Sequence, residues 1–196
     1  MNVILPALEL PAARVETPHG AMVVPGRALP ARSVDIDASL VARLIGAARS
    51  AAGCAHVPYS NFHVGAALVM ADDPQARVFT GANIENASYG ATNCGERSAI
   101  FAAAAAGFRR IRYLAVSTVD SLGQPIEQRS PCGICRQVIG EFAMHADPGN
   151  PGSPGDPDAL AASGDETLVF IDSGAEGVLC EILDMERLLP FSFRLG

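Results

Sequence analysis

Two short segments of the chain contain the residues best suited to chemistry. The first holds Cys94 and Glu96, and the second holds Cys132 and Cys135, which follow Pro131. Three thiolates can bind one zinc ion and leave its fourth position for water, which zinc makes nucleophilic near neutral pH. The carboxylate of Glu96, two residues after the first thiolate, can carry protons to and from that water. This pattern predicts a catalytic site with one Zn²⁺ per chain.

A Cys-x-x-Cys pair taken alone has other interpretations. It also occurs in structural zinc ribbons and in redox enzymes of the thioredoxin type. A zinc ribbon needs a second close pair of cysteines, and Cys94 has no cysteine near it in the sequence. A redox pair needs neither a third thiolate nor a carboxylate. The catalytic interpretation therefore accounts for more of the residues than either alternative does.

A zinc ion and three thiolates together carry a net charge of −1. This charge should weaken the acidification of the zinc-bound water. We expect Cys94 and Cys132 to lie at helix N-termini, where the partial positive charge stabilises a thiolate. Arg97 is the candidate to donate hydrogen bonds to the cysteine sulfurs from outside the ligand set, because such donors tune metal sites. Arg136 is the weaker competitor for that role, and a surface ion pair is the ordinary interpretation of either arginine.

The elements that must position these residues alternate between strands and helices, which is typical of an α/β layered domain. Helical spacing of apolar residues predicts a helix from Asp37 to about Gly53. Further helices are expected from Cys94 to about Gly107 and from Cys132 to about Met144. The expected strands cover residues 62–70, 77–82, 112–119, 167–171 and 177–180, and a last helical turn is expected at residues 185–189.

The chain resembles cytidine deaminases, specifically the small homotetrameric type with three zinc-binding cysteines. A Cys or His, then one residue and Glu, followed later by Pro-Cys-x-x-Cys, is the signature of zinc-dependent nucleobase deaminases. The resemblance extends from about residue 40 to residue 193. Four blocks carry it: 58–67 (PYSNFHVGAA), 81–89 (GANIENASY), 94–100 (CGERSAI) and 130–139 (SPCGICRQVI).

This resemblance implies a three-layer α/β/α domain with a mixed five-stranded sheet. It implies that Phe62 packs on a pyrimidine ring, although a large apolar residue is more often part of a core. Asn83 and Glu85 resemble the pair that holds the ribose hydroxyls, and their spacing places both on one side of a strand. The binding segment continues through Asn86 and Tyr89. The resemblance also implies that Phe193 enters the site of a neighbouring subunit, while docking on its own core is the alternative.

The resemblance favours hydrolysis of cytidine and 2′-deoxycytidine to uridine and 2′-deoxyuridine with release of ammonia, as in pyrimidine salvage. A modified cytosine nucleoside, or an antibiotic such as blasticidin S, is the alternative substrate. Gly95 and the two added segments, residues 1–35 and about 145–166, motivate this alternative. The family commonly has alanine at position 95, and glycine would remove a methyl group beside the base. An editing enzyme for polynucleotides and a catalytically silent zinc protein are further alternatives.

Bulk properties limit the partners and the location. The chain has 196 residues and a net charge of −7, so it lacks the basic footprint of a nucleic-acid binder. Its odd number of cysteines, five, argues against a full disulfide framework. We find no secretory signal and no apolar run long enough to span a membrane. We therefore expect a cytoplasmic protein with reduced thiols and a small soluble substrate.

The expected organisation is one catalytic domain, residues 36–196, preceded by an arm. Residues 1–35 are rich in Pro, Ala and Val without clean periodicity. We interpret them as an extended arm or a poorly ordered tail, in either case free to lie over a neighbouring subunit. A segment dense in Pro and Gly at about residues 145–166 is interpreted as a surface insertion.

Overall fold

The structure is a computed structural model that describes residues 1–144 and 166–193. It divides into two compact units, Met1–Ala38 and Ser39–Gly196, which are described separately. The predicted insertion lies almost wholly at residues 145–165, outside the described residues.

A mixed five-stranded sheet forms the centre of the second unit, as predicted. Its strands are β7 (Val64–Met70), β8 (Phe79–Ala82), β9 (Ile111–Thr118), β10 (Leu168–Asp172) and β11 (Cys180–Asp184). Their order across the sheet is β11-β10-β9-β7-β8. Only β9 and β10 run parallel, and the other neighbouring pairs are antiparallel. All seven residues of β7 are buried, as expected for a strand covered on both faces.

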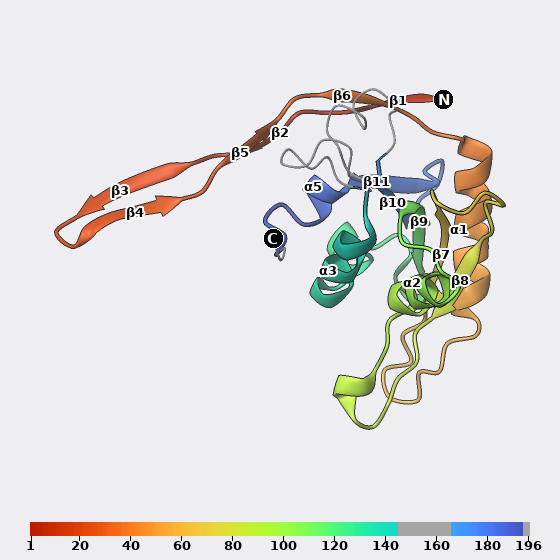
Figure 1. Ribbon diagram of the computed structural model, residues 1–196. Helices are drawn as coiled ribbons and strands as arrows, with labels where there is room; N and C mark the ends of the chain where they lie inside the picture. The colour runs from red at the N-terminus through yellow and green to blue at the C-terminus, as the bar shows by residue number, and fades with distance from the viewer. Residues whose placement is uncertain (145–165, 194–196) are drawn as a thin grey trace. The chain divides into compact units, whose positions relative to one another are not determined.

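Helices cover both faces of this sheet (Figure 1). Helix α1 (Ala38–Ala52) covers one face, and α2 (Gly95–Ala105) and α3 (Gly133–Phe142) cover the other. Two glycines permit close packing: a Cβ at Gly65 would lie 2.0 Å from the carbonyl oxygen of Ala48 in α1, and a Cβ at Gly81 would lie 2.3 Å from the amide nitrogen of Ala99 in α2. Because alternate strand positions face opposite sides, this arrangement confirms the predicted three-layer α/β/α fold.

The main core lies between the sheet and helices α2 and α3. Ile100 of α2 and Ile139 of α3 pack in it, together with apolar residues of β7, β9 and β10. On the other face, Arg49 of α1 donates two hydrogen bonds, of 2.7 and 2.6 Å, to the fully buried carboxylate of Asp172. This ion pair ties α1 to the end of β10. Because Asp172 has no exposure to water, loss of Arg49 would leave a buried charge poorly compensated.

The last predicted strand was placed wrongly. Residues 177–179 belong to the turn between β10 and β11, because Asp172 pairs with Cys180 and everything between them lies beyond the ladder. Gly177 has a φ of +75°, which is a turn conformation. The strand therefore begins at Cys180, and the short helix α5 (Met185–Leu188) follows it directly, where the helical turn was predicted.

The first unit is a two-stranded antiparallel ribbon in three segments (Figure 1). It pairs β1 (Asn2–Leu5) with β6 (Arg32–Asp35), β2 (Leu8–Leu10) with β5 (Arg27–Leu29), and β3 (Ala13–Thr17) with β4 (Gly20–Val24). Prolines 6, 11, 25 and 30 stand at the breaks between segments, where the missing N–H interrupts a ladder. Among the described residues, none of the helices has the length and apolar character needed to cross a membrane.

Candidate active site

Two helix starts bring the three predicted metal ligands together. Cys94 is the N-cap residue of α2 and Cys132 is the N-cap residue of α3, as predicted. Cys135 lies in the first turn of α3 and is fully buried. Both helices therefore direct their positive ends at the sulfur cluster, which favours the thiolate form.

The spacing of the three sulfurs fits zinc. The Sγ atoms of Cys94 and Cys132 lie 3.9 Å apart, and those of Cys132 and Cys135 lie 3.5 Å apart. All three lie within 4.8 Å of one another. Tetrahedral zinc with Zn–S bonds of about 2.3 Å requires sulfurs about 3.8 Å apart. The donor set therefore suits a zinc ion with one position left open.

Glu96 places a buried carboxylate beside this cluster. Its side chain is only 3% exposed, and its Oε2 has no hydrogen-bond partner within the described part of the chain. A buried polar atom without a partner is costly, so such an atom in a native site points to a missing ligand or water. Burial raises the pKa of Glu96 to about 7, and the nearby charge of Cys94 adds to the shift. A carboxyl group with this pKa can both accept and release a proton near neutral pH.

Of Cys94 and Cys135, Cys94 is the cysteine whose thiolate form is favoured. The pKa of Cys94 is lowered to about 5, chiefly by a hydrogen bond from the Cys135 thiol and also by the guanidinium of Arg97. Arg97 Nη2 lies 3.8 Å from the Cys94 sulfur and donates a 2.9 Å hydrogen bond to the Thr92 carbonyl. Arg136 instead bonds the Pro131 and Leu188 carbonyls and the Ser130 hydroxyl. Arg97 therefore makes the expected contact with a cysteine sulfur, and the described hydrogen bonds of Arg136 go to other groups.

Asn83 is buried and holds the loop that leads into β7. Its Oδ1 accepts a 2.8 Å hydrogen bond from the Val64 amide, and its Nδ2 donates one of 2.8 Å to the Phe62 carbonyl. Phe62 itself is partly buried against the main core. Asn83 thus fixes the backbone on both sides of His63, and with it the ring of Phe62.

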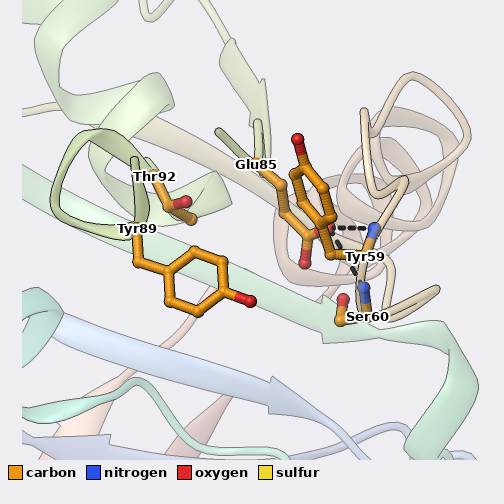
Figure 2. A pocket seen from close by; sticks show the side chains of 5 residues that line it. All are labelled: Tyr59, Ser60, Glu85, Tyr89 and Thr92. Carbon is orange, nitrogen blue, oxygen red and sulfur yellow. Dashed lines mark hydrogen bonds between the residues drawn. The ribbon is translucent and has the colours of Figure 1, made fainter. Parts of the chain in front are cut away.

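Glu85 lines a cavity of about 350 Å³ together with Tyr59, Ser60, Tyr89 and Thr92 (Figure 2). Its Oε2 accepts hydrogen bonds from the amides of Tyr59, at 2.9 Å, and Ser60, at 3.2 Å. Hydrogen bonding by Ser60 and Tyr59 keeps the pKa of Glu85 below its usual range, so this carboxylate is charged at neutral pH. The rings of Tyr59 and Tyr89 meet edge to face, with centroids 6.3 Å apart.

Glu85 and the metal ligands are joined by a short backbone connection. Beyond β8, Ile84 pairs with Asn93 through two hydrogen bonds of 2.8 and 2.9 Å, and Asn93 directly precedes Cys94. The segment between them returns as a loop in which the Asn86 amide donates to Thr92 Oγ1 at 3.1 Å. Sugar-binding candidates and zinc-binding candidates therefore lie on adjoining backbone.

Two of the predicted substrate-binding residues are exposed to solvent. Tyr89 is 78% exposed and Phe193 is 68% exposed. The carbonyl of Phe193 accepts a 2.8 Å hydrogen bond from Gln137 of α3. The structure therefore brings Tyr89 to the cavity of Glu85, whereas Phe193 is not among the residues that line it.

The sequence interpretation missed Tyr59, Ser60 and Thr92 as lining residues. Tyr59 and Ser60 stand in the same block as Phe62, and Thr92 stands two residues before Cys94. Their role follows from the return of the 59–64 loop to Glu85, a contact across about 25 residues that no local pattern encodes.

Gly95 lies against the sheet. A Cβ at this position would lie 2.8 Å from the carbonyl oxygen of Val64 and 3.3 Å from that of Gly81. Both atoms belong to the backbone of the sheet, so the absent methyl group would point at β7 and β8. The glycine permits close packing of the helix start, and its expected effect on the base stays a prediction.

An α/β/α domain with three converging thiolates and a buried carboxylate defines a class of zinc-binding hydrolases that activate water. The family model described as "Cytidine and deoxycytidylate deaminase zinc-binding region" matches residues 39–146. The chain belongs to this family, and it is an enzyme of the hydrolytic deaminase kind.

Relatives of known name agree with this assignment. A cytidine deaminase of Sporosarcina psychrophila is 46% identical over 108 residues, which is 55% of this chain and 74% of that protein. A cytidine deaminase of Halalkalibacterium halodurans is 51% identical over 88 residues, which is 45% of this chain and 61% of that protein.

Solved structures show the same likeness. The crystal structure of cytidine deaminase from Burkholderia pseudomallei superposes with a TM-score of 0.55 at 37% identity, covering 77% of this chain and 97% of that one. The cytidine deaminase of Mycobacterium tuberculosis gives a TM-score of 0.52 at 33% identity, covering 82% of this chain and all of that one.

Proposed function

We propose that this enzyme hydrolyses cytidine and 2′-deoxycytidine to uridine and 2′-deoxyuridine, releasing ammonia. The observation that carries the proposal is the buried carboxylate of Glu96, with a partnerless Oε2, beside three sulfurs spaced for zinc. A purely structural zinc site has no need of such a carboxylate. The names of the relatives supply the substrate class.

Cys94, Cys132 and Cys135 would hold the zinc ion. When bound, zinc supplies a Lewis acid that lowers the pKa of a coordinated water to about 7. Glu96 accepts the proton of the attacking water and delivers it to the ring nitrogen next to the reacting carbon. The same carboxyl group then takes the proton of the hydroxyl now bonded to that carbon and passes it to the departing amine, so that one water is consumed and one ammonia leaves. Arg97 moderates the charge on the Cys94 sulfur, which helps a three-thiolate site to activate water.

The sugar would be recognised by the residues around the Glu85 cavity. The charged carboxylate of Glu85 accepts hydrogen bonds from the ribose hydroxyls, and Asn86 continues that polar edge. Asn83 positions the loop and uses the remaining hydrogen-bonding capacity of its amide for the sugar. Phe62 packs on the pyrimidine ring and Tyr89 lines the entrance. A cavity of about 350 Å³ is at the small end of the range for ligand sites, which suits a free nucleoside.

We further propose that the enzyme is a cytoplasmic homotetramer acting in pyrimidine salvage. The exposed ring of Phe193 supports the assembly, because a large apolar side chain near a chain end is suited to entering a neighbouring subunit. No observation favours the alternative of an antibiotic or modified nucleoside as substrate, and the named relatives are cytidine deaminases.

The decisive experiment follows the absorbance loss of cytidine with wild-type enzyme and with Glu96→Gln. Glu96→Gln should lower kcat by about 10³-fold or more while zinc content stays at about one per chain, because it removes the proton carrier and no ligand. Glu141→Gln is the matched control, since Glu141 lies exposed on α3. Near-normal turnover by Glu96→Gln would overturn the mechanism.

A substrate panel under the same conditions tests the specificity. Cytidine and 2′-deoxycytidine should turn over, whereas blasticidin S, 5-methylcytidine and single-stranded DNA should react at least about 100-fold more slowly. Failure of cytidine, with turnover of one of the others, would replace the substrate and leave the chemistry of Glu96 intact.

A further inference from the structure

The peptide group that joins Phe62 to His63 is held by side chains on both of its sides. Its carbonyl accepts a 2.8 Å hydrogen bond from Asn83 Nδ2, and its amide donates one of 2.5 Å to Asp120 Oδ2. The peptide precedes β7, which begins at Val64, so neither bond belongs to the sheet. Because the N–H and C=O of a trans peptide point in opposite directions, the two side chains grip the peptide from opposite sides.

Asp120 reaches this peptide from a separate part of the second unit. It lies in the 3₁₀ turn η2 (Val119–Ser121), which follows β9 directly. Val64 and Thr118 stand opposite each other in the ladder of β7 and β9, so the end of β9 lies beside the start of β7. From η2 the chain continues to α3, whose start carries two of the three sulfurs. Asp120 therefore ties the segment of Phe62 to the connection that leads to the metal ligands.

The ring of His63 makes a second contact with the same carboxylate. Its Nδ1 lies 2.9 Å from Asp120 Oδ2. The His63 amide, and after it the His63 ring, hold the pKa of Asp120 below its usual range. The acceptor is therefore a charged carboxylate at neutral pH, and hydrogen bonds to charged acceptors are stronger than those between neutral groups.

The stability of the whole fold does not account for this pair. The side chains of His63 and Asp120 are 32% and 41% exposed, and ion pairs this exposed contribute little to the free energy of unfolding. Locally the bonds matter more, because Asn61 has a φ of +55° and the chain therefore enters the segment from a turn. A group that contacts a substrate must be held to within about 0.5 Å. Outside the sheet, that precision depends on side chains such as Asp120.

We propose that Asp120 is a positioning residue for the pyrimidine contact. By holding the Phe62–His63 peptide from the side opposite Asn83, it sets the ring of Phe62 for packing on the base. This inference rests on the proposed function, in which Phe62 contacts the pyrimidine. Asp120 itself touches neither the base nor the sulfurs in this scheme, and it acts through the backbone of Phe62.

Steady-state kinetics with cytidine test the proposal. Asp120→Ala removes both bonds and should raise KM about fivefold, because a displaced ring loses part of its aromatic contact. Its kcat should stay within about twofold of wild type, since the sulfurs and the proposed proton carrier keep their places. Asp120→Asn keeps an acceptor oxygen for the amide and should restore KM to within about twofold.

Glu127→Ala is the matched control, because Glu127 is an exposed carboxylate in the same connection between β9 and α3. Its KM should equal that of wild type. Equal KM values for Asp120→Ala and Glu127→Ala would overturn the proposal. So would a loss confined to kcat in Asp120→Ala, since a displaced ring weakens binding.

The route through Phe62 is tested by combining variants. In Phe62→Leu the ring is already gone, so the addition of Asp120→Ala should change KM by less than about 1.5-fold. A further fivefold rise in the double variant would show that Asp120 acts without the ring, and would contradict the proposal. His63→Ala removes only the contact of the ring and leaves the amide, so its KM should rise less than that of Asp120→Ala.

Hydrogen exchange separates this inference from the proposed function. In full-length, zinc-loaded enzyme, the His63 amide should exchange at least about ten times faster in Asp120→Ala than in Glu127→Ala, while the amides of α1 exchange alike. If wild-type enzyme leaves cytidine unchanged although exchange differs in this way, the proposed function fails and the hold on the peptide is confirmed. If the His63 amide exchanges equally in the two variants, the positioning role is wrong whatever the substrate is.

Discussion

The zinc-binding cluster and the proposed sugar-binding segment differ in how far the described structure buries their residues. Cys94, Cys132 and Cys135 converge from two helix starts within 4.8 Å, beside a Glu96 that is buried. Tyr89 and Phe193, by contrast, stand exposed on a loop and near the chain end. The proposed chemistry rests on helix starts held against the sheet, and the proposed recognition relies partly on exposed side chains.

This difference has a physical origin. A metal ligand must be held within a fraction of an ångström, which a helix start pinned to a sheet achieves. A sugar contact must admit and release its ligand, so it benefits from a loop with exposed hydrogen bonds. The two requirements meet at the Ile84–Asn93 backbone pair, which joins the loop to the first ligand.

The largest effect is expected when Cys135, one of the proposed zinc ligands, is removed. Cys135→Ala should reduce zinc from about one per chain to near zero and lower activity by more than about 10³-fold, because two thiolates cannot close the site. Zinc content by atomic absorption and turnover are measured together. Cys54→Ala serves as the control, since Cys54 is an exposed cysteine outside the cluster. Full zinc content in Cys135→Ala would contradict the ligand assignment.

The next largest effect is expected at Glu85, in the proposed sugar-binding segment. Glu85→Gln should lower kcat/KM for cytidine by about 10- to 100-fold, since hydrogen bonds to a charged group contribute about 1.5–3 kcal/mol. Zinc content should not change, because Glu85 bonds the amides of Tyr59 and Ser60 and no sulfur. If Glu85→Gln instead lost its zinc, the two regions would not be separable.

A smaller effect is expected at Arg97, which connects the two regions through Thr92 and Cys94. Arg97→Gln should weaken zinc binding by about tenfold, at the low end of the effects measured for residues that orient metal ligands. Competition with a chromogenic chelator measures it. Arg136→Gln is the comparison, because Arg136 bonds carbonyls and a hydroxyl. Equal zinc affinities in the two variants would remove the special role of Arg97.

The smallest effect concerns the pH dependence of thiol reactivity in metal-free enzyme. The pKa of Cys94 is lowered to about 5, so its thiolate is present at pH 7 and is lost only as the pH falls below about 5. Burial raises the pKa of Cys180 to about 11, so its thiolate appears only as the pH rises toward that value.

At pH 7 iodoacetamide should therefore modify Cys94 about ten times faster than Cys180. The much larger thiolate fraction of Cys94 is partly offset by the weaker nucleophilicity of a low-pKa thiolate. Peptide mass spectrometry after timed quenching measures both rates. Faster modification of Cys180 would contradict the charge placement at Cys94.

The metal site was predictable from sequence because its parts are local. Each cysteine pair or cysteine–glutamate pair lies within one helical turn, and a helix start fixes the rest. The cavity around Glu85 was only partly predictable, since Tyr59 and Ser60 reach it through a return of the chain. Asn83 was expected at the sugar, and the structure adds that its amide also holds the backbone of Phe62 and Val64.

Pairing between distant residues explains why the strands of the first unit and the start of β11 were not predicted. The strands of the first unit are three to five residues long, interrupted by prolines, and β1 pairs with a strand about 30 residues away. Such short segments show no periodicity of their own. Val178 has a strand-forming side chain, but the register of β10 with β11 places residues 177–179 in the turn.

The close packing at Gly81 and Gly95 limits which positions can be varied when the enzyme is engineered. Gly81 and Gly95 together seat the first turns of α2 on the sheet, and that helix carries Cys94 at its cap and Glu96 in its first turn. A library aimed at new substrates should exclude large side chains at these positions, because a Cβ alone would lie 2.8 Å from the Val64 carbonyl oxygen at position 95 and 2.3 Å from the Ala99 amide nitrogen at position 81. Diversity belongs in residues 59–62 and 86–92, which include Tyr59, Ser60, Tyr89 and Thr92 of the cavity around Glu85.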